Sequence, residues 1–400
     1  MSTKKLEKFI QAPSSEVFLY FTNSTALKDW LCDVATADPR PGGRLYMWWN
    51  GDYYTSGEYL KVVKDEFISF TWFGRGEPHA TRVDVTLKNK KTGTLLKLIH
   101  RKLGNNSTWV GIGDTYEKEW SRGLGNLASV LESGEDLRIT TRPMLGIFIN
   151  DFNAGIAEKL GVPIVEGLRL GGVVEGLGAQ KAGLKSDDVI TRMDGSEITG
   201  AGSLSTFMHD KKAGDVVEVT YYRCSDKETI PMTLSGRPIP SIPASGMELS
   251  KQVEPVYHQY EGEIESLLKD SSEEECTKKP NDTEWSVKEV LAHLIHTELG
   301  WQNLVSEIMG GHEGAYDDFG GNTQAHIDGT VSTFTTKTDL FNELKNHNSE
   351  TLNMYAHIPI EFIARKGKFW KLAYQANQNS YHLQTHLAQM RSAIESAQKK

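Results

Sequence analysis

The sequence predicts a multidomain α+β protein in which two modules that contain β-strands precede one all-helical module. Three observations support this fold class. A chain of 400 residues is long enough for two to four domains. The period of the hydrophobic pattern changes along the chain, and two stretches rich in Gly, Pro and polar residues, 133–143 and 235–246, look like joints. We therefore predict four segments: a first domain at 1–135, a second at 142–235, a proline-rich linker at 236–248 and a third domain at 249–400.

Composition and charge exclude several classes of partner. The formal net charge is −9, which repels nucleic-acid phosphates, so no nucleic-acid binding is expected. No apolar run approaches the roughly 20 residues of a membrane span, and the first residues lack the apolar segment of a signal peptide. The cysteines Cys32, Cys224 and Cys276 are odd in number and far apart, which argues against a disulfide framework. These features predict a cytoplasmic protein.

The first module combines strands with one long helix. Stretches rich in β-branched and aromatic residues predict strands at 45–49, 57–63, 67–72, 81–87 and 94–100. The period then changes: Trp120, Leu124, Leu127 and Leu131 are spaced 4, 3 and 4 residues apart, as on one face of a helix over about 115–133. A sheet followed by one amphipathic helix requires that the helix cover the sheet.

Several short sequence strings in this module form a recognisable set. They are Ile10-Gln11-Ala12-Pro13, Asp38-Pro39-Arg40-Pro41-Gly42-Gly43, Gly57-Glu58-Tyr59, Phe70-Thr71-Trp72 and Gly93-Thr94-Leu95, followed by the helix of Trp120. As a set they resemble the ATPase-activator-like branch of the START-like (SRPBCC) superfamily. The resemblance implies a helix-grip fold around a cavity for a small hydrophobic ligand. Candidate lining residues are Trp48, Phe70, Trp72 and Trp120, although the same aromatic side chains could simply fill the core.

The second module has the pattern of a peptide-binding domain. The string from Ala179 to Gly195 combines a short helix, a glycine turn, a buried strand and a second turn at fixed offsets, and it resembles a bacterial-type PDZ domain with its small β-barrel. The resemblance implies that the loop Leu145-Gly146-Ile147-Phe148 binds a peptide carboxyl terminus through backbone N–H groups. Residues of a helix at 203–211 would face the peptide: Leu204, Phe207 or Met208. The alternative is a PDZ fold used only for packing.

The third module carries the sharpest chemical prediction. Ser286 and Glu289 form a capping-box pattern that starts a helix with His293 on its apolar side. His382 and His386 lie four residues apart on a later helix, so they share one face and suit one metal ion. An imidazole on an apolar face needs a partner, which is either a metal or a hydrogen-bonding neighbour.

The two histidine strings, from Trp285 to Leu294 and from His382 to Met390, resemble the DinB-like family of four-helix bundles. The resemblance implies that His293, His382 and His386 are ligands of a divalent metal, with Zn²⁺ or Ni²⁺ preferred. It also implies a possible transferase activity with low-molecular-weight thiols. His296 is either a neighbour of the site or a surface residue. The glycine-rich stretch 310–329, with His312 and His326, is expected to be a loop, either a lid or a solvated segment.

Three functional hypotheses remain open on the sequence. The first is a cytosolic binding protein that holds an apolar ligand, a peptide tail and a metal ion in its three modules, in stress response or detoxification. The second is a metal-dependent thiol transferase that acts through the histidine site. The third is a co-chaperone-like stress protein. No residue is singled out as catalytic.

Overall fold

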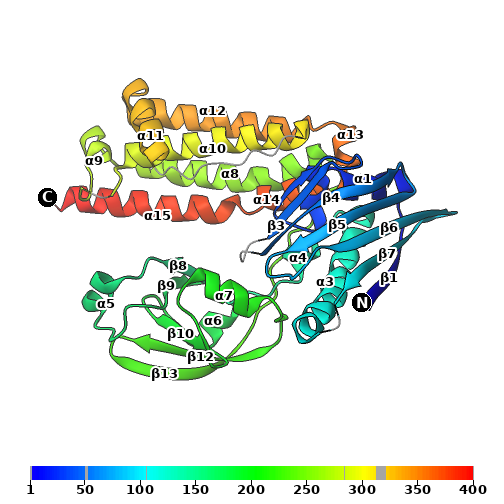
Figure 1. Ribbon diagram of the computed structural model, residues 1–400. Helices are drawn as coiled ribbons and strands as arrows, with labels where there is room; N and C mark the ends of the chain where they lie inside the picture. The colour runs from blue at the N-terminus through cyan, green and yellow to red at the C-terminus, as the bar shows by residue number, and fades with distance from the viewer. Residues whose placement is uncertain (1, 50–52, 105, 283, 312–320, 400) are drawn as a thin grey trace. The chain divides into compact units, whose positions relative to one another are not determined.

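The computed structural model describes residues 2–49, 53–104, 106–282, 284–311 and 321–399 (Figure 1). The chain divides into two compact units, Met1–Ile239 and Pro240–Lys400. The first unit contains both sheets and the second is helical, so the predicted multidomain α+β class is confirmed. In the described part of the chain, no helix is both long and apolar enough to cross a lipid bilayer.

The first domain is built on one antiparallel sheet of seven strands in the order β1-β7-β6-β5-β4-β3-β2. All five predicted strands are present, each within a few residues of its expected bounds. The sequence reading did not include the two end strands, because one is rich in lysine and the other has four residues. The strands are β1 Ser2–Ile10, β2 Val34–Ala37, β3 Arg44–Trp49, β4 Tyr53–Val63, β5 Phe67–Gly74, β6 Thr81–Lys90 and β7 Gly93–Leu103.

Helix α3, Ser107–Glu132, covers the inner face of this sheet, as a helix-grip fold requires (Figure 1). Its predicted apolar face is buried: Trp120, Leu124, Leu127 and Leu131 belong to the same core cluster as inward residues of the strands. Two short helices, α1 Ser14–Thr22 and α2 Ser24–Trp30, add further residues to that core.

The stretch 133–143, predicted to be a joint, contains a short helix, α4 Leu137–Thr140. Arg138 ties it to the first domain, because its guanidinium donates to the carbonyl oxygens of Lys28 and Cys32 at 2.8 and 3.2 Å. Asp136 holds Arg138 and also accepts a hydrogen bond from Asn126 at 3.0 Å. The chain therefore leaves the first domain through a fixed segment.

The second domain contains a small antiparallel sheet with the order β13-β12-β10-β9-β8, in which β11 pairs with β10. Its core comes from the apolar residues of the strands together with α6 and α7. Strand β8 lies at one end of this sheet among the described strands, so one of its edges is free. The elements are β8 Ile147–Asn150, α5 Ala154–Leu160, β9 Leu168–Val173, α6 Gly178–Lys181, β10 Val189–Met193, β11 Ser196–Glu197, α7 Ala201–Met208, β12 Val216–Arg223 and β13 Asp226–Thr233.

The second unit is a helical bundle of four long helices. Helix α8 packs on α12 and α15, and α10 packs on the same two helices, which closes the bundle (Figure 1). Shorter helices connect the long ones. The long helices are α8 Gly246–Lys269, α10 Val287–Gly310, α12 Lys337–Ala356 and α15 Asn379–Gln398; the shorter ones are α9 Glu273–Thr277, α11 Gly321–Thr333, α13 Ile360–Ile363 and α14 Lys366–Ala376.

The predicted capping box begins α10. The backbone N–H of Ser286 donates to Glu289 Oε2 at 2.8 Å, and the N–H of Glu289 donates to Ser286 Oγ at 3.3 Å. Each bond satisfies a donor that a helix start leaves free, and such a cap contributes about 1 kcal/mol. The cap fixes where the helix begins and hence which residues face the bundle interior.

The stretch 310–329 is not a continuous loop as predicted. Residues 312–320, including His312, lie outside the described residues, but α11 begins at Gly321 and includes His326. The buried Ile327, which packs in the bundle core, anchors this helix in spite of Gly329. The glycines suggested a loop, and burial of one isoleucine outweighs their low helix propensity.

Candidate metal centre

The three predicted histidines converge in the bundle. His293 projects from α10, and His382 and His386 project from α15 one helical turn apart. The Nε2 atom of His382 lies 3.3 Å from Nε2 of His293 and 3.0 Å from Nε2 of His386. One nitrogen from each ring lies within 4.8 Å of the other two. The i,i+4 spacing and the inward face of α10 together produce this convergence.

These distances fit a shared cation. Bonds of 2.0–2.1 Å from a metal to nitrogen place two ligands about 3.3 Å apart in a tetrahedron and about 3.0 Å apart at right angles. The two observed separations span these values, so the donor set suits Zn²⁺ and also Ni²⁺. In the alternative, a trio held by hydrogen bonds alone, His382 Nε2 would have to share a single proton or a single lone pair between two neighbouring nitrogens.

The histidines are held in their neutral form. Burial, with a smaller contribution from the neighbouring imidazoles, lowers the pKa of His293 to about 4. Burial likewise lowers the pKa of His382 to about 4 and lowers the pKa of His386. At neutral pH the rings therefore carry lone pairs that a cation can use without displacing protons.

Two further side chains shape the site, and the sequence reading assigned neither of them a role. Gln389 lies one turn after His386, and its Oε1 accepts a hydrogen bond from His386 Nδ1 at 2.9 Å. A proton on Nδ1 leaves the lone pair of that ring on Nε2, where the three rings meet. The indole of Trp285 lies 4.9 Å from the His293 ring and 6.4 Å from the His386 ring, and forms an aromatic wall.

The other histidines in the described part of this region do not join the triad. Among the described residues, His293, His382 and His386 are the one group of potential metal ligands that converges. His296 instead stacks on His326 of α11, with ring centres 3.9 Å apart and an angle of 18° between the planes. Burial and the charge of His326 lower the pKa of His296.

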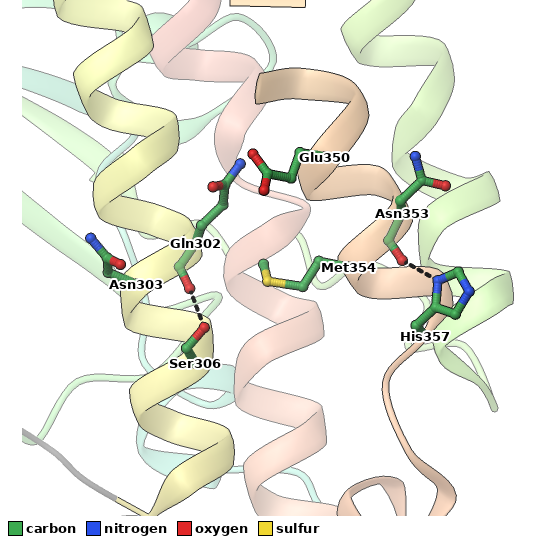
Figure 2. Close-up of a pocket in the computed structure, with 7 residues that line it drawn as sticks. All are labelled: Gln302, Asn303, Ser306, Glu350, Asn353, Met354 and His357. Carbon is green, nitrogen blue, oxygen red and sulfur yellow. Dashed lines mark hydrogen bonds between the residues drawn. The ribbon is translucent and has the colours of Figure 1, made fainter. Parts of the chain in front are cut away.

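A separate polar pocket opens between α10 and α12 of the same bundle. It has a volume of about 410 Å³, and Figure 2 shows its lining side chains. Hydrogen bonds from Ser306 to the Gln302 carbonyl, at 2.9 Å, and between His357 and the Asn353 carbonyl, at 2.7 Å, hold two of these side chains on their own helices. None of the triad histidines lines this pocket, whose residues are Gln302, Asn303, Ser306, Glu350, Asn353, Met354 and His357.

The residues predicted for the carboxylate-binding loop lie just before and at the start of strand β8. Leu145 and Gly146 precede this strand, and their carbonyl oxygens accept hydrogen bonds from Ala179 and Val174 at 2.9 and 2.8 Å. A carboxylate-binding loop requires this arrangement, because its carbonyl oxygens must point away from an anion. Ile147 is half-buried, and Phe148 is exposed on β8.

Helix α7 supplies the other residues predicted for the groove. Leu204 and Phe207 are partly buried and pack against the edge of the domain core. The ammonium group of Lys211 lies 4.7 Å from the centre of the Phe207 ring. Met208 is only 5% exposed and belongs to the core itself, so it is packed inside the domain rather than in a groove.

The aromatic residues predicted to line a cavity in the first domain have two different locations. Phe70, Trp72 and Trp120 are buried in the core, in accord with the core-filling alternative. Trp48 does not face that core, because residues alternate along a strand and the inward positions of β3 are Leu45, Met47 and Trp49. The alternation with Leu45 and Met47 was the available signal for choosing Trp49 instead.

Comparison with known protein families identifies each domain in turn. Residues 11–132 match the family described as Activator of Hsp90 ATPase homolog 1-like protein, residues 143–234 match the PDZ domain, and residues 257–390 match the DinB superfamily. Among solved structures, similar chains include the Aha1 dimer from Colwellia psychrerythraea (16% identity, TM-score 0.30) and an HSP90 activator from Plasmodium falciparum (23%, 0.29). They cover 33% of this chain each, and 97% and 96% of their own chains.

Curated relatives share a smaller part of the chain. A probable periplasmic serine endoprotease DegP-like from Marinomonas sp. is 36% identical over 98 residues, which is 24% of this chain and 21% of the relative. A serine protease Do-like HtrA from Lactococcus lactis is 32% identical over 120 residues, which is 29% of each. The chain thus spans less than a third of the length of these relatives. By the three family matches, the chain combines a START-like domain of the Hsp90 ATPase activator homolog type, a PDZ domain and a DinB superfamily domain.

Proposed function

We propose that the protein is a cytosolic three-domain binding protein whose DinB-like bundle holds a divalent metal ion on His293, His382 and His386. The PDZ domain would take a peptide carboxyl terminus and the START-like domain a small apolar ligand. Such a protein would bring a metal site, a peptide partner and an apolar molecule together on one chain. Responses to stress and detoxification are the processes in which we expect it to act.

The observation that carries this proposal is the convergence of three imidazole nitrogens on one point. His382 Nε2 lies 3.3 and 3.0 Å from its two neighbours, and no carboxylate or cysteine among the described residues shares the group of potential ligands. Three neutral donors leave coordination positions open, which is the pattern of exchangeable and catalytic sites. The donor type favours Zn²⁺ or Ni²⁺ over Mg²⁺ and Ca²⁺, which prefer oxygen ligands.

Independent features support binding by the other two domains. The free edge of β8 carries the exposed side chains of Phe148 and Ile149, and a peptide that adds a strand there would cover them. In the first domain, the partly exposed Trp49 packs against the buried Trp72, which packs against Trp120, and an apolar molecule would contact this aromatic cluster at Trp49.

A direct test begins with the metal content of the full-length protein and its titration with Zn²⁺ and Ni²⁺ by isothermal calorimetry. One equivalent is expected to bind the wild type, and His386→Ala is expected to weaken binding by more than about a hundredfold, because one of three donors is lost. His258→Ala is the matched control, since His258 is an exposed histidine on α8 of the same bundle. Unchanged binding in His386→Ala would contradict the proposal.

The geometry also supports a second candidate function, transfer of a low-molecular-weight thiol. The residues His293, His382 and His386 are only half-buried, so each is partly exposed to solvent, and a thiol would have to approach from the exposed side. A bound divalent cation would lower the pKa of a thiol there and make it a better nucleophile. The protein itself would hold His386 in one tautomer through Gln389 and shield one side with Trp285.

In this reaction the thiol sulfur forms a bond to an electrophilic carbon, and the thiol proton passes to solvent. The test measures consumption of glutathione with 1-chloro-2,4-dinitrobenzene, from which chloride leaves. Consumption above the uncatalysed rate that is lost in His386→Ala and kept in His258→Ala would support the transferase. A wild-type rate in His386→Ala would exclude this site as its source.

A further inference from the structure

A buried polar cluster lies on the inner face of the START-like sheet, in a region that the sequence reading treated as apolar. Its centre is Glu77, which is 7% exposed. The hydroxyl groups of Tyr53 and Tyr116 both donate to the same carboxyl oxygen, Glu77 Oε1. The other oxygen, Oε2, is buried and has no hydrogen-bond partner in the described structure. Burial raises the pKa of this carboxyl group, against the opposing effect of the donors around it.

A second buried polar atom without a partner belongs to the neighbouring strand. Thr55 is 2% exposed, and its Oγ1 makes no hydrogen bond in the described structure. Thr55 on β4 is directly opposite Gly74 on β5, so both positions point to the same face of the sheet. A Cβ atom at Gly74 would overlap Glu77 Oε1 and the Tyr53 hydroxyl. Glycine at position 74 therefore makes the space that Glu77 and Tyr53 occupy next to Thr55.

Other polar groups near these two unpaired atoms do have hydrogen-bond partners. The indole N–H of Trp120 donates to His100 Nδ1 at 3.2 Å, and His100 Nε2 lies 2.7 Å from Thr81 Oγ1. Trp72 donates to the Tyr53 hydroxyl at 3.2 Å. An isolated hydroxyl and an isolated carboxyl oxygen in the core destabilise a fold, and a ligand with a polar group at this place would satisfy both.

The surroundings of the cluster are aromatic, with the rings tilted or edge-on to one another. The ring of Trp72 lies 6.0 Å from Trp49, 6.0 Å from Tyr116 and 5.3 Å from Trp120. Trp49 and Tyr53 are partly exposed, whereas the other rings are buried, so the cluster reaches the surface through these two side chains. Aromatic side chains favour contact with planar apolar molecules, and the buried polar atoms would favour a molecule that also carries a hydrogen-bonding group.

We propose that Glu77 Oε2 and Thr55 Oγ1 are the polar anchor of a ligand site in the START-like domain, and that the ligand is an aromatic molecule bearing a hydroxyl group. A hydroxyl group can donate to Glu77 and accept from Thr55 at the same time, which neither a hydrocarbon nor an ether can do. The aromatic body of the ligand lies against Trp49 and Trp72. This inference rests on the proposed binding of a small apolar ligand by this domain and specifies the class of that ligand.

The test compares two probes of the same shape, 2-naphthol and naphthalene, by equilibrium dialysis against the full-length protein. The wild type is expected to bind 2-naphthol at least about tenfold more tightly than naphthalene. A site with buried hydrogen-bonding groups discriminates strongly against an analogue that leaves those groups unpaired. Thr55→Val and Glu77→Gln are each expected to bring the two affinities to within about threefold by removing one half of the anchor. Glu58→Gln, at an exposed position on the same strand β4, is the matched control and should keep the full preference.

The outcomes separate this inference from the function on which it rests. Equal binding of both probes by the wild type, or an unchanged preference in both variants, overturns the anchor and leaves apolar binding intact. Failure of both probes to bind overturns the anchor and also the proposed ligand binding of the domain. Thr55→Val decides the matter if Glu77→Gln does not fold, because it replaces an unpaired buried hydroxyl by a methyl group of the same size.

Discussion

Gln389 offers a specific test of how the metal centre is built, because it acts through a ligand without being one. Its Oε1 accepts a hydrogen bond from His386 Nδ1 at 2.9 Å, whereas Nδ1 of His293 and Nδ1 of His382 have no described partner. Gln389→Ala removes the one described contact that fixes the tautomer of a triad histidine. A hydrogen bond of this kind contributes about 1 kcal/mol, and loss of such a contact typically weakens metal binding 10- to 100-fold.

We therefore expect Gln389→Ala to weaken Zn²⁺ binding by about tenfold, which corresponds to about 1.4 kcal/mol. Gln389→Glu should restore or exceed wild-type affinity, because a carboxylate is the stronger acceptor. The measurement is a competition titration against a chelator of known affinity, with Gln384→Ala as control, since Gln384 is exposed on the same helix. Wild-type affinity in Gln389→Ala, or equal losses in the Ala and Glu variants, would refute the proposed positioning of His386.

Three further expectations concern stability. Removing the metal with a chelator should lower the melting temperature of the bundle by about 5–10 °C, because an ion present at a hundred times its Kd adds about 2.7 kcal/mol to the free energy of unfolding. Equal melting temperatures with and without chelator, measured by calorimetry, would argue against a bound metal. Burial lowers the pKa of His100 to about 3, so below pH 6.5 the unfolded chain takes up a proton that the folded domain does not, and stability falls as the pH decreases through that window. Between pH 6.5 and 5 the wild type should lose about 1.6 kcal/mol more than His100→Gln in urea unfolding, and parallel losses would contradict this. Gly146 has a φ of +80° and no room for a Cβ beside Leu177, so Gly146→Ala should lower the free energy of unfolding by about 2 kcal/mol. Gly202→Ala, at an open position of α7, should raise it by about 0.5 kcal/mol. If urea unfolding shows the opposite order of stability, the loop at Gly146 is not constrained.

The features that sequence could predict are those that depend on spacing within one element. The i,i+4 pair His382 and His386 must share a helix face, and the capping box at Ser286 fixes the register that turns His293 inward. Strands with alternating patterns and the apolar face of α3 were predictable for the same reason. Convergence of the two helices follows from the bundle, which the family resemblance supplied and periodicity alone could not.

The features that sequence could not predict depend on contacts between distant elements. Glu77 lies in a turn after β5, and only the folded sheet brings it to Tyr53 and Tyr116. His326 lies in a glycine-rich stretch, where burial of Ile327 decides in favour of a helix. The choice between Trp48 and Trp49 did have a local signal, the alternation along β3, and the prediction based on aromatic character overlooked it.

The division of the triad between two helices has a kinetic consequence. His293 and His382 are 89 residues apart in the chain, whereas His382 and His386 share α15, so detachment of this one helix would withdraw two of the three donors at once. Local opening of a single helix costs less than global unfolding. The lifetime of a bound ion would then be set by how often α15 undocks. A chelator in excess could shorten that lifetime only to this limit, beyond which the rate of metal loss no longer depends on chelator concentration.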